Sequence, residues 1–151
     1  MTWLKKYFYF FPILFYLPAL GNFFSSVDWF HLRITQIDTF QQFLNFFSFN
    51  QTPQTASFYR PLSTQVFFYV FQTFFGLNSS VYFLFGLVLF VYSIYLVKRF
   101  SSLYLDGQTS ILAAIIYGVS VSNFTRVYFV SAFQELFLVV FSLLTLINFK
   151  S

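Results

Sequence analysis

The feature that most constrains this chain is an apolar run at residues 79–97, "SSVYFLFGLVLFVYSIYLV", which is followed at once by Lys98 and Arg99. A helix needs roughly 20 mostly apolar residues to cross the roughly 30 Å of hydrocarbon in a bilayer. The run contains no acidic or basic residue, and lysine and arginine are enriched in cytoplasmic loops. It therefore predicts a membrane-spanning helix that ends at the inner surface.

The composition agrees with a chain that lies in lipid. Charged residues make up 8% of the 151 positions, whereas soluble domains carry about 25%, so the chain cannot cover a water-facing surface. The net charge of +4 comes from scattered lysine and arginine, so nucleic acid is not an expected partner. Cysteine is absent, which excludes disulfides, thiolate metal sites and a cysteine nucleophile. Three further apolar runs predict spans: residues 7–26 behind Lys5 and Lys6, residues 111–121, and residues 131–149 in front of Lys150.

The run at residues 7–26 also fits a secretory signal peptide, because two lysines precede an apolar stretch. Its length, its many phenylalanines, Pro12, Pro18 and the lack of a small-x-small cleavage site favour an uncleaved anchor. In that case the N-terminus stays in the cytoplasm and residue 27 emerges outside. We therefore expect an integral protein of the cell membrane.

The helix expected at residues 61–76 decides the topology. About fourteen helical residues reach only about 21 Å. Glutamine and threonine fall mostly on one side and phenylalanine on the other. We therefore expect a half-inserted or interfacial helix, which leaves four spans and keeps the basic residues that flank them inside. The cations that remain outside are Arg33, Arg60 and Arg126.

The first outer loop, residues 27–60, carries a second surface element. Residues 34–47, "ITQIDTFQQFLNFF", place apolar side chains at spacings of three or four, which predicts an amphipathic helix lying flat on the outer leaflet. A polar loop follows at residues 49–57. No repeat divides residues 1–151, so we expect a single all-α membrane region with four spans, an interfacial helix and a half-inserted helix.

The stretch "SSVDWFHLR" at residues 25–33 places Asp28, His31 and Arg33 directly after the first span. A carboxylate leaving lipid is partly removed from water, which can make it a competent base. His31 lies on the same side if a helix begins at the two serines. The alternative is that Asp28 caps a helix N-terminus while His31 and Arg33 face water. Two ligands are too few for a metal site, so no cofactor is expected and a divalent metal is not supported.

Arg60 stands in "FYRPL". Pro61 keeps Arg60 out of the helical region and can open the following helix, which holds the guanidinium beside a helix N-terminus. Both features favour an anion, and arginine grips phosphate bidentately. The alternative is general binding to lipid headgroups. At the outer end of the last span, Glu135 gains from the helix dipole but costs free energy to bury. It fits either a structural pair with Arg126 or Arg60, or a functional role.

The order of these features resembles the amino-terminal part of GT-C-fold membrane glycosyltransferases, in the branch of protein O-mannosyltransferases and related bacterial membrane proteins. The likeness rests on residues 58–100, "FYRPLSTQVFFYVFQTFFGLNSSVYFLFGLVLFVYSIYLVKRF". It continues at residues 122–149, "SNFTRVYFVSAFQELFLVVFSLLTLINF", where a polar step opens the fourth span. With the first span, the acidic outer loop and the surface helix that precede these segments, the likeness covers nearly the whole chain.

The resemblance implies an enzyme that moves a sugar from a polyprenyl-phosphate carrier to an unidentified acceptor on the outer face. It matches Asp28 to the loop acid that serves as catalytic base or acceptor-binding group. It matches Arg60 to the arginine that holds the lipid phosphate, and Glu135 to the acid at the start of the fourth span. The family commonly has two adjacent acids in the loop, and Val27 replaces the first here. The family also has more spans, which implies the front of a larger hexosyltransferase, inactive alone.

This interpretation requires Asp28 and Arg60 to be neighbours at one membrane surface, opening onto a shared hollow. His31 and Arg126 are the other candidate substrate-binding residues. The opposing hypothesis is a small non-catalytic membrane protein whose outer helix binds lipid or a partner. A transporter is poorly supported, because the spans lack charged midplane residues and paired glycine or proline interruptions.

Overall fold

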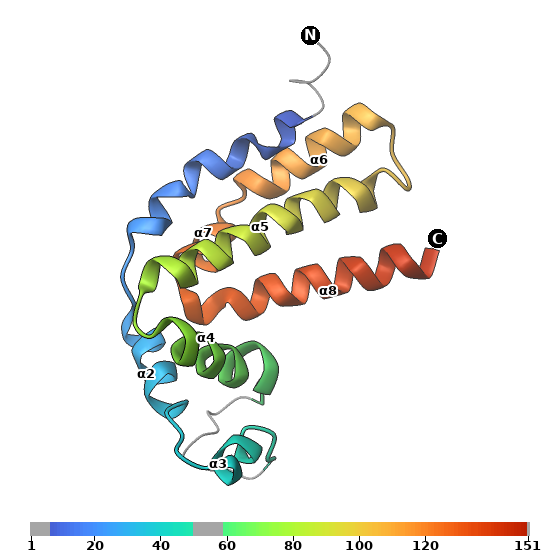
Figure 1. Ribbon diagram of the computed structural model, residues 1–151. Coiled ribbons are helices and arrows are strands. Elements are labelled where there is room, and N and C mark those ends of the chain that lie inside the picture. The colour runs from blue at the N-terminus through green and yellow to red at the C-terminus, as the bar shows by residue number, and fades with distance from the viewer. Residues whose placement is uncertain (1–6, 50–58, 151) are drawn as a thin grey trace.

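The computed structural model describes residues 7–49 and 59–150, and every regular element within these ranges is helical (Figure 1). The all-α class predicted from the sequence is therefore confirmed. Elements labelled η are 3-10 helices, except η3, which is a π-helix. In chain order the elements are η1 (Phe8–Phe15), η2 (Leu17–Gly21), α2 (Ser26–Ile34), α3 (Phe40–Asn45), η3 (Pro61–Val66), α4 (Phe67–Phe75), α5 (Ser79–Ser101), α6 (Gly107–Val119), α7 (Ser122–Tyr128), η4 (Val130–Ala132) and α8 (Phe133–Lys150).

The long helices lie side by side and form the body of the molecule. The segment η1–η2 and α6 run in one direction, while α5 and α8 run in the other (Figure 1). Helix α5 is central, since it contacts η1, η2, α6, α7 and α8. Its aromatic residues Tyr82, Phe83 and Phe90 are fully buried and form the middle of the core. The shorter helices α2, α3 and α4 lie together at one end of this body.

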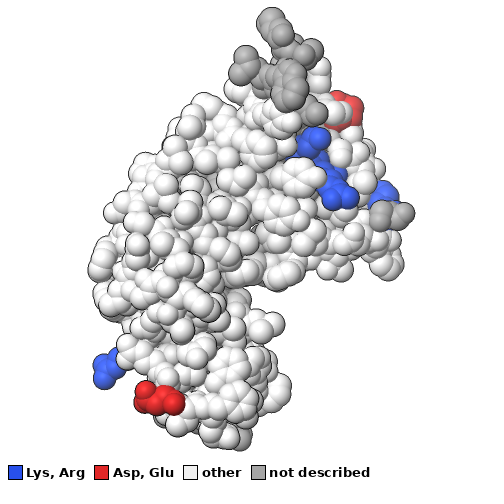
Figure 2. Space-filling view, in the orientation of Figure 1, with Lys and Arg blue, Asp and Glu red and all other residues white. Residues whose placement is uncertain are grey.

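Two helices are long and apolar enough to cross a membrane. They are Ser79–Ser101 and Val130–Lys150, the latter being η4 and α8 together. On the face shown in Figure 2, charged side chains lie at the two ends of the molecule with a broad uncharged zone between them. The protein is therefore a membrane-embedded helical protein with two to four candidate spans, and the four-span topology stays a prediction. The count reaches four if each of two bent pairs is one span: Phe8–Gly21 with Ser26–Ile34, bent by 68°, and Gly107–Val119 with Ser122–Tyr128, bent by 62°.

The first segment is a 3-10 helix, and its two prolines explain why. Pro12 lies inside η1 and Pro18 near the start of η2. Each proline lacks the N–H that an α-helical turn needs, and its ring collides with the carbonyl four residues earlier. Because a 3-10 helix rises about 2.0 Å per residue, Phe8–Gly21 covers about 28 Å, close to the thickness of the hydrocarbon.

Two glycines allow the helices to approach closely. A methyl group built on Gly86 of α5 would overlap the ring of Phe133 at the start of α8. A methyl group on Gly118 of α6 would lie 2.7 Å from Cγ of Pro12 in η1. Small residues at helix contacts are a common basis of packing in membranes, where dispersion contacts replace the hydrophobic effect. These two positions fix how α8 and η1 sit against their neighbours.

The surface helix predicted at residues 34–47 was wrong in its extent. Ile34 closes α2, and only Phe40–Asn45 forms α3 after a non-helical stretch. Thr39 and Gln42 form a capping box in which each side chain accepts from the backbone N–H of the other. This exchange satisfies N–H groups that would otherwise lack partners, so it starts α3 six positions after the predicted helix began.

The helix predicted at residues 61–76 is present as η3 followed by α4, and it is not one of the candidate spans among the described residues. It ends at Gly76, whose φ of 58° lies in the left-handed region that favours glycine. The half-inserted position of this helix stays a prediction. The polar loop predicted at 49–57 lies, from residue 50 on, outside the described residues, as do Lys5 and Lys6.

Candidate functional site

A cavity of about 700 Å³ lies between the start of η3 and the first half of α8, and we call it the α8 groove. In Figure 2 the surface is hollowed between the body of long helices and the smaller end that holds α3 and α4. Residues 59–63 line one side of the groove. The other side is lined by Gln134, Glu135, Phe137, Leu138 and Phe141.

The first wall of the groove depends on the Arg60–Pro61 step. Arg60 has φ −142° and ψ 55°, outside the helical region, and Pro61 begins η3 directly after it. This is the conformation that the sequence predicts, because the proline ring disfavours the helical region for the residue before it. The carbonyl of Arg60 accepts the N–H of Thr64 at 3.1 Å, which anchors the turn. The guanidinium of Arg60 supplies the positive charge of the lining.

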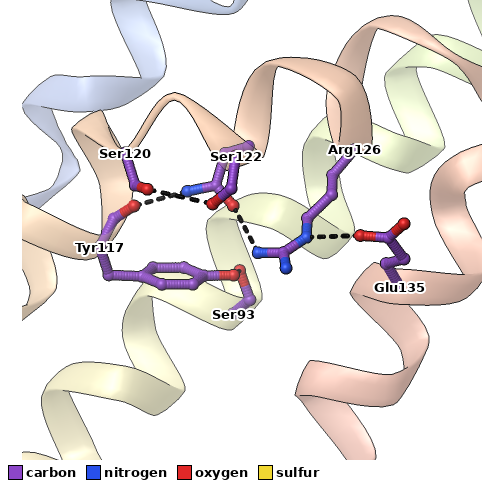
Figure 3. Close-up of polar contacts among 7 residues, drawn as sticks. Ser93, Tyr117, Ser120, Ser122, Arg126 and Glu135 are labelled. Carbon is purple, nitrogen blue, oxygen red and sulfur yellow. Dashed lines mark hydrogen bonds and ion pairs between the residues drawn. The ribbon is translucent and has the colours of Figure 1, made fainter.

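The second wall carries an ion pair. Nε of Arg126 lies 3.0 Å from Oε2 of Glu135, and the two side chains are 22% and 49% exposed (Figure 3). Nη1 of Arg126 also donates to Oδ1 of Asn123 at 3.1 Å. The structural pair with Arg126 that the sequence left open is therefore formed. Arg126 therefore balances the charge of Glu135, and Arg60 is the basic residue of the groove lining.

The ion pair belongs to a chain of polar contacts that joins four helices (Figure 3). The amide of Asn123 on α7 donates to the carbonyl of Tyr117 on α6. The hydroxyl of Tyr117 shares a hydrogen bond of 2.9 Å with Oγ of Ser93 on α5. Buried polar groups need such partners, since an unpaired one is costly in a low-dielectric interior. The network thereby holds the polar end of α8 against the core.

One end of the groove is polar, and the wall that continues from it along α8 is apolar. Thr64 Oγ1 donates to Gln134 Oε1 at 3.3 Å and ties the two walls together. Leu138 and Phe141 follow along α8 and are 67% and 61% exposed. At 1.5 Å per residue the apolar wall extends about 9 Å from Glu135 along the helix. A cationic end beside an apolar wall suits an amphiphile whose head is anionic.

Asp28 lies behind the groove rather than in it. Its side chain is 0% exposed. Oδ2 accepts the backbone N–H and the hydroxyl of Ser25, each at 2.8 Å, in a capping box at the start of α2. Oδ1 accepts the backbone N–H of Ser131 in η4 at 2.6 Å. The capping role that the sequence left open is therefore formed, and the catalytic role stays a prediction.

His31 also lies behind the groove. Its ring stacks on Phe68 of α4 with centroids 5.3 Å apart and an interplanar angle of 24°. Nδ1 is buried without a hydrogen-bond partner in the described part of the chain. The charges of Asp28 and Arg60 both act on this ring, and α2 contacts η3. Asp28 and Arg60 therefore lie at the same end of the molecule. Only Arg60 reaches the hollow, however.

Sequence reasoning missed most of the α8 wall, although a signal was present. Gln134, Phe137, Leu138 and Phe141 follow the spacing i, i+3, i+4, i+7, which marks one face of a helix. Ser131 carried no such signal, because its role rests on its backbone N–H. No group of three or more metal-ligating residues occurs among residues 7–49 and 59–150.

Comparisons with known proteins add no match. No protein-family model matches the chain, and no curated protein or solved structure does so either. The site is therefore interpreted from its own geometry, together with the sequence resemblance given above. The geometric facts that matter are the charge of Arg60, the paired state of Glu135 and the apolar wall of α8.

Proposed function

We propose that this chain binds a polyprenyl phosphate in the α8 groove, as the amino-terminal portion of a membrane glycosyltransferase that takes a sugar from that carrier on the outer face. The observation that carries the proposal is the groove itself. It joins a guanidinium at one end to an apolar wall on a candidate span at the other.

The phosphate is assigned to Arg60. A guanidinium presents parallel N–H donors that match two oxygens of a phosphate, and charge-assisted bonds of this kind are roughly twice as strong as neutral ones. Glu135 lies at the same end but is paired with Arg126 at 3.0 Å, so its repulsion of an anion is offset. Ser63 and Gln134 add uncharged polar groups to this end of the lining.

The prenyl chain is assigned to the apolar wall. Phe137, Leu138 and Phe141 lie on a helix that belongs to a candidate span, Val130–Lys150. A lipid chain beside such a helix runs in the same direction as the helix. A cavity of about 700 Å³ falls within the range of sites for small ligands, which suits a headgroup and the first part of a chain.

The transfer step rests on the family resemblance, and the groove supports one part of it. Glu135 is the carboxylate of the lining and is half exposed. A carboxylate and an amide side by side, as in Glu135 and Gln134, are able to hydrogen-bond sugar hydroxyls. A base must be within hydrogen-bond reach of the proton it removes. Asp28 meets this condition only after losing its three hydrogen bonds to Ser25 and Ser131.

The test of the binding step uses the purified chain in micelles of a zwitterionic detergent, with farnesyl phosphate and farnesol as matched probes. We expect the phosphate to bind about tenfold more tightly than the alcohol, because one charge-assisted contact separates them. Arg60→Gln should abolish this preference. Arg33→Gln is the matched control, since Arg33 is exposed and does not line the groove. Equal affinity for both probes in the unaltered chain would contradict the proposal.

A second candidate function is a non-catalytic protein that docks its outer helix on lipid. It is favoured by the exposed apolar side chains around α3, where Phe40 is 74% and Phe49 87% exposed. This function predicts that Phe40→Ser weakens binding of the chain's outer end to bilayers while the preference for farnesyl phosphate is unchanged. Sugar transfer from a polyprenyl-phosphate hexose by a longer protein containing this chain would favour the enzyme instead.

A further inference from the structure

Asp28 connects two helix starts that are far apart in the sequence. One carboxylate oxygen accepts two bonds from Ser25 at the start of α2. The other accepts the backbone N–H of Ser131, which is 103 positions further along the chain. The first N–H groups of a helix have no partner within it, and a carboxylate there also gains from the helix dipole. A fully buried Asp28 therefore binds α2 to the segment that opens α8.

This bond acts on the polar end of the α8 groove. Ser131 lies in η4, which passes directly into α8, so Gln134 and Glu135 follow within about one helical turn. The opposite wall, η3, contacts both α2 and α8, and Thr64 bonds Gln134 across the two walls. The position of η4 relative to α2 therefore determines how far the polar groups of α8 lie from Arg60.

We propose that Asp28 is a positioning residue that sets the distance between the polar groups of α8 and Arg60, and that it does so through the backbone of Ser131. The inference rests on the proposed function, since it concerns the same groove. It assigns to Asp28 a role in binding the lipid phosphate rather than in removing a proton. Asparagine cannot accept from Ser25 and from Ser131 with one oxygen for each, because an amide has a single acceptor oxygen where the carboxylate has two.

The first test measures the affinity of the Asp28→Asn variant for farnesyl phosphate and for farnesol. We expect the preference for the phosphate to fall about tenfold, because a buried donor at the start of α8 loses a charged acceptor. Affinity for farnesol should be unchanged, since the apolar wall is untouched. A catalytic base would leave the preference for the phosphate at the level of the unaltered chain, and that result would overturn the inference.

A double variant separates positioning from a general loss of stability. If Asp28 acts through the spacing between α8 and Arg60, Asp28→Asn should weaken phosphate binding little further in an Arg60→Gln background. Effects of residues that share one interaction are not additive, whereas those of independent sites are. Thermal unfolding of the single and double variants should instead show additive shifts. Additive losses of phosphate affinity would contradict the proposal.

A second pair of variants tests the same bond from its other side. Ser131→Pro removes the backbone N–H that Asp28 accepts, and proline is tolerated in the first turn of a helix. Ser131→Ala keeps the N–H and removes only the hydroxyl. We expect Ser131→Pro to reproduce the loss seen for Asp28→Asn and Ser131→Ala to bind like the unaltered chain. Equal behaviour of the two variants would overturn the inference, as would the failure of both Asp28→Asn and Ser131→Pro to fold.

The outcomes also separate this inference from the proposed function. If the unaltered chain shows no preference for farnesyl phosphate, the proposed function fails, and with it the basis of the inference. If the preference is present and Arg60→Gln removes it, while Asp28→Asn and Ser131→Pro retain it, only the positioning role fails.

Discussion

Two faces of α8 both carry large apolar side chains but have different surroundings. One face carries Phe133, Leu136 and Val140, which are buried against the core, and α8 packs along α5. The other face carries Leu138 and Phe141, which line the α8 groove and are largely exposed. In a soluble protein a polar surface would distinguish these faces. In α8 the two faces differ in how closely they pack. Because Gly86 has no side chain, the ring of Phe133 can lie directly against α5.

The comparison shows that one face of a membrane helix can stabilise the fold while another face of the same helix is left to bind a ligand. Lipid chains are as apolar as leucine, so association of helices depends on close van der Waals contact rather than on removal from water. The buried face of α8 makes that contact with α5. The groove face does not, and it is therefore available to a ligand whose chain resembles lipid.

The largest effect is expected from breaking the packed face. Phe133→Ala removes a fully buried ring and leaves a cavity between α5 and α8. Substitutions of this kind cost about 3–5 kcal/mol. Thermal unfolding in detergent would measure the loss. Leu138→Ala is the control on the other face and should change stability by less than about 0.5 kcal/mol, as surface substitutions do. A similar loss for both would show that the two faces do not differ in packing.

A smaller effect is expected from the groove face. Phe141→Ala should weaken binding of farnesyl phosphate and farnesol equally, by about tenfold, because both probes lose the same apolar contact. Stability should be retained. Val140→Ala, on the packed face, should show the reverse pattern of reduced stability and retained affinity. Titration calorimetry with both probes would measure the affinities, and a loss confined to the phosphate would contradict the assignment of Phe141 to the chain.

The smallest effect is expected away from both faces, at the turn before α6. Asp106 caps α6, since its side chain accepts the N–H groups of Gln108 and Thr109. A hydrogen bond from the hydroxyl of Thr109, followed by these backbone bonds, lowers the pKa of Asp106 below its ordinary value of 3.8. The stability that this carboxylate contributes is therefore present above pH 3.8 and is lost as the pH falls through the lower pKa of the folded state.

Asp106→Asn is the matched variant, because asparagine also caps helices but does not titrate. We expect the melting temperatures of the two chains to differ by a constant amount at neutral pH and to converge in acid. A difference that stays constant down to the lowest pH at which the chain folds would show that the carboxylate contributes nothing as an anion. A difference in melting temperature that grows in acid would show that the predicted shift in the pKa of Asp106 has the wrong sign.

Features fixed by a few adjacent residues could be predicted from the sequence. The apolar runs at residues 79–97 and 131–149 predict the two long helices, because length and hydrophobicity suffice for that purpose. The non-helical conformation of Arg60 follows from Pro61 alone. The helix that begins at Ser26 was likewise accessible, because Ser25 and Asp28 have the spacing of a capping box.

Features that depend on distant contacts could not be predicted. The bond from Ser131 to Asp28 leaves no trace in residue type, since any residue except proline has a backbone N–H. The surface helix was placed too early because the periodicity of residues 34–47 continues through two elements, while the capping box at Thr39 decides where α3 begins. Pro12 and Pro18 are visible in the sequence, but they do not indicate that the whole segment forms 3-10 helix.

The 3-10 form of the first segment has a consequence for its shape. A helix with three residues per turn aligns positions i and i+3 along its axis, so its faces are straight rather than winding. Phe8, Phe11 and Leu14 form one such row, and all three are exposed, with the first two rings stacked 5.6 Å apart. Tyr9 and Pro12 are buried in a second row, but Phe15, the next position of that row, is 59% exposed, and the buried positions continue at Tyr16 and Ala19. The buried side of the segment therefore follows the Tyr9 row as far as Pro12 and moves by one position at Tyr16, where η1 and η2 meet, so each 3-10 helix turns its own straight row toward the core.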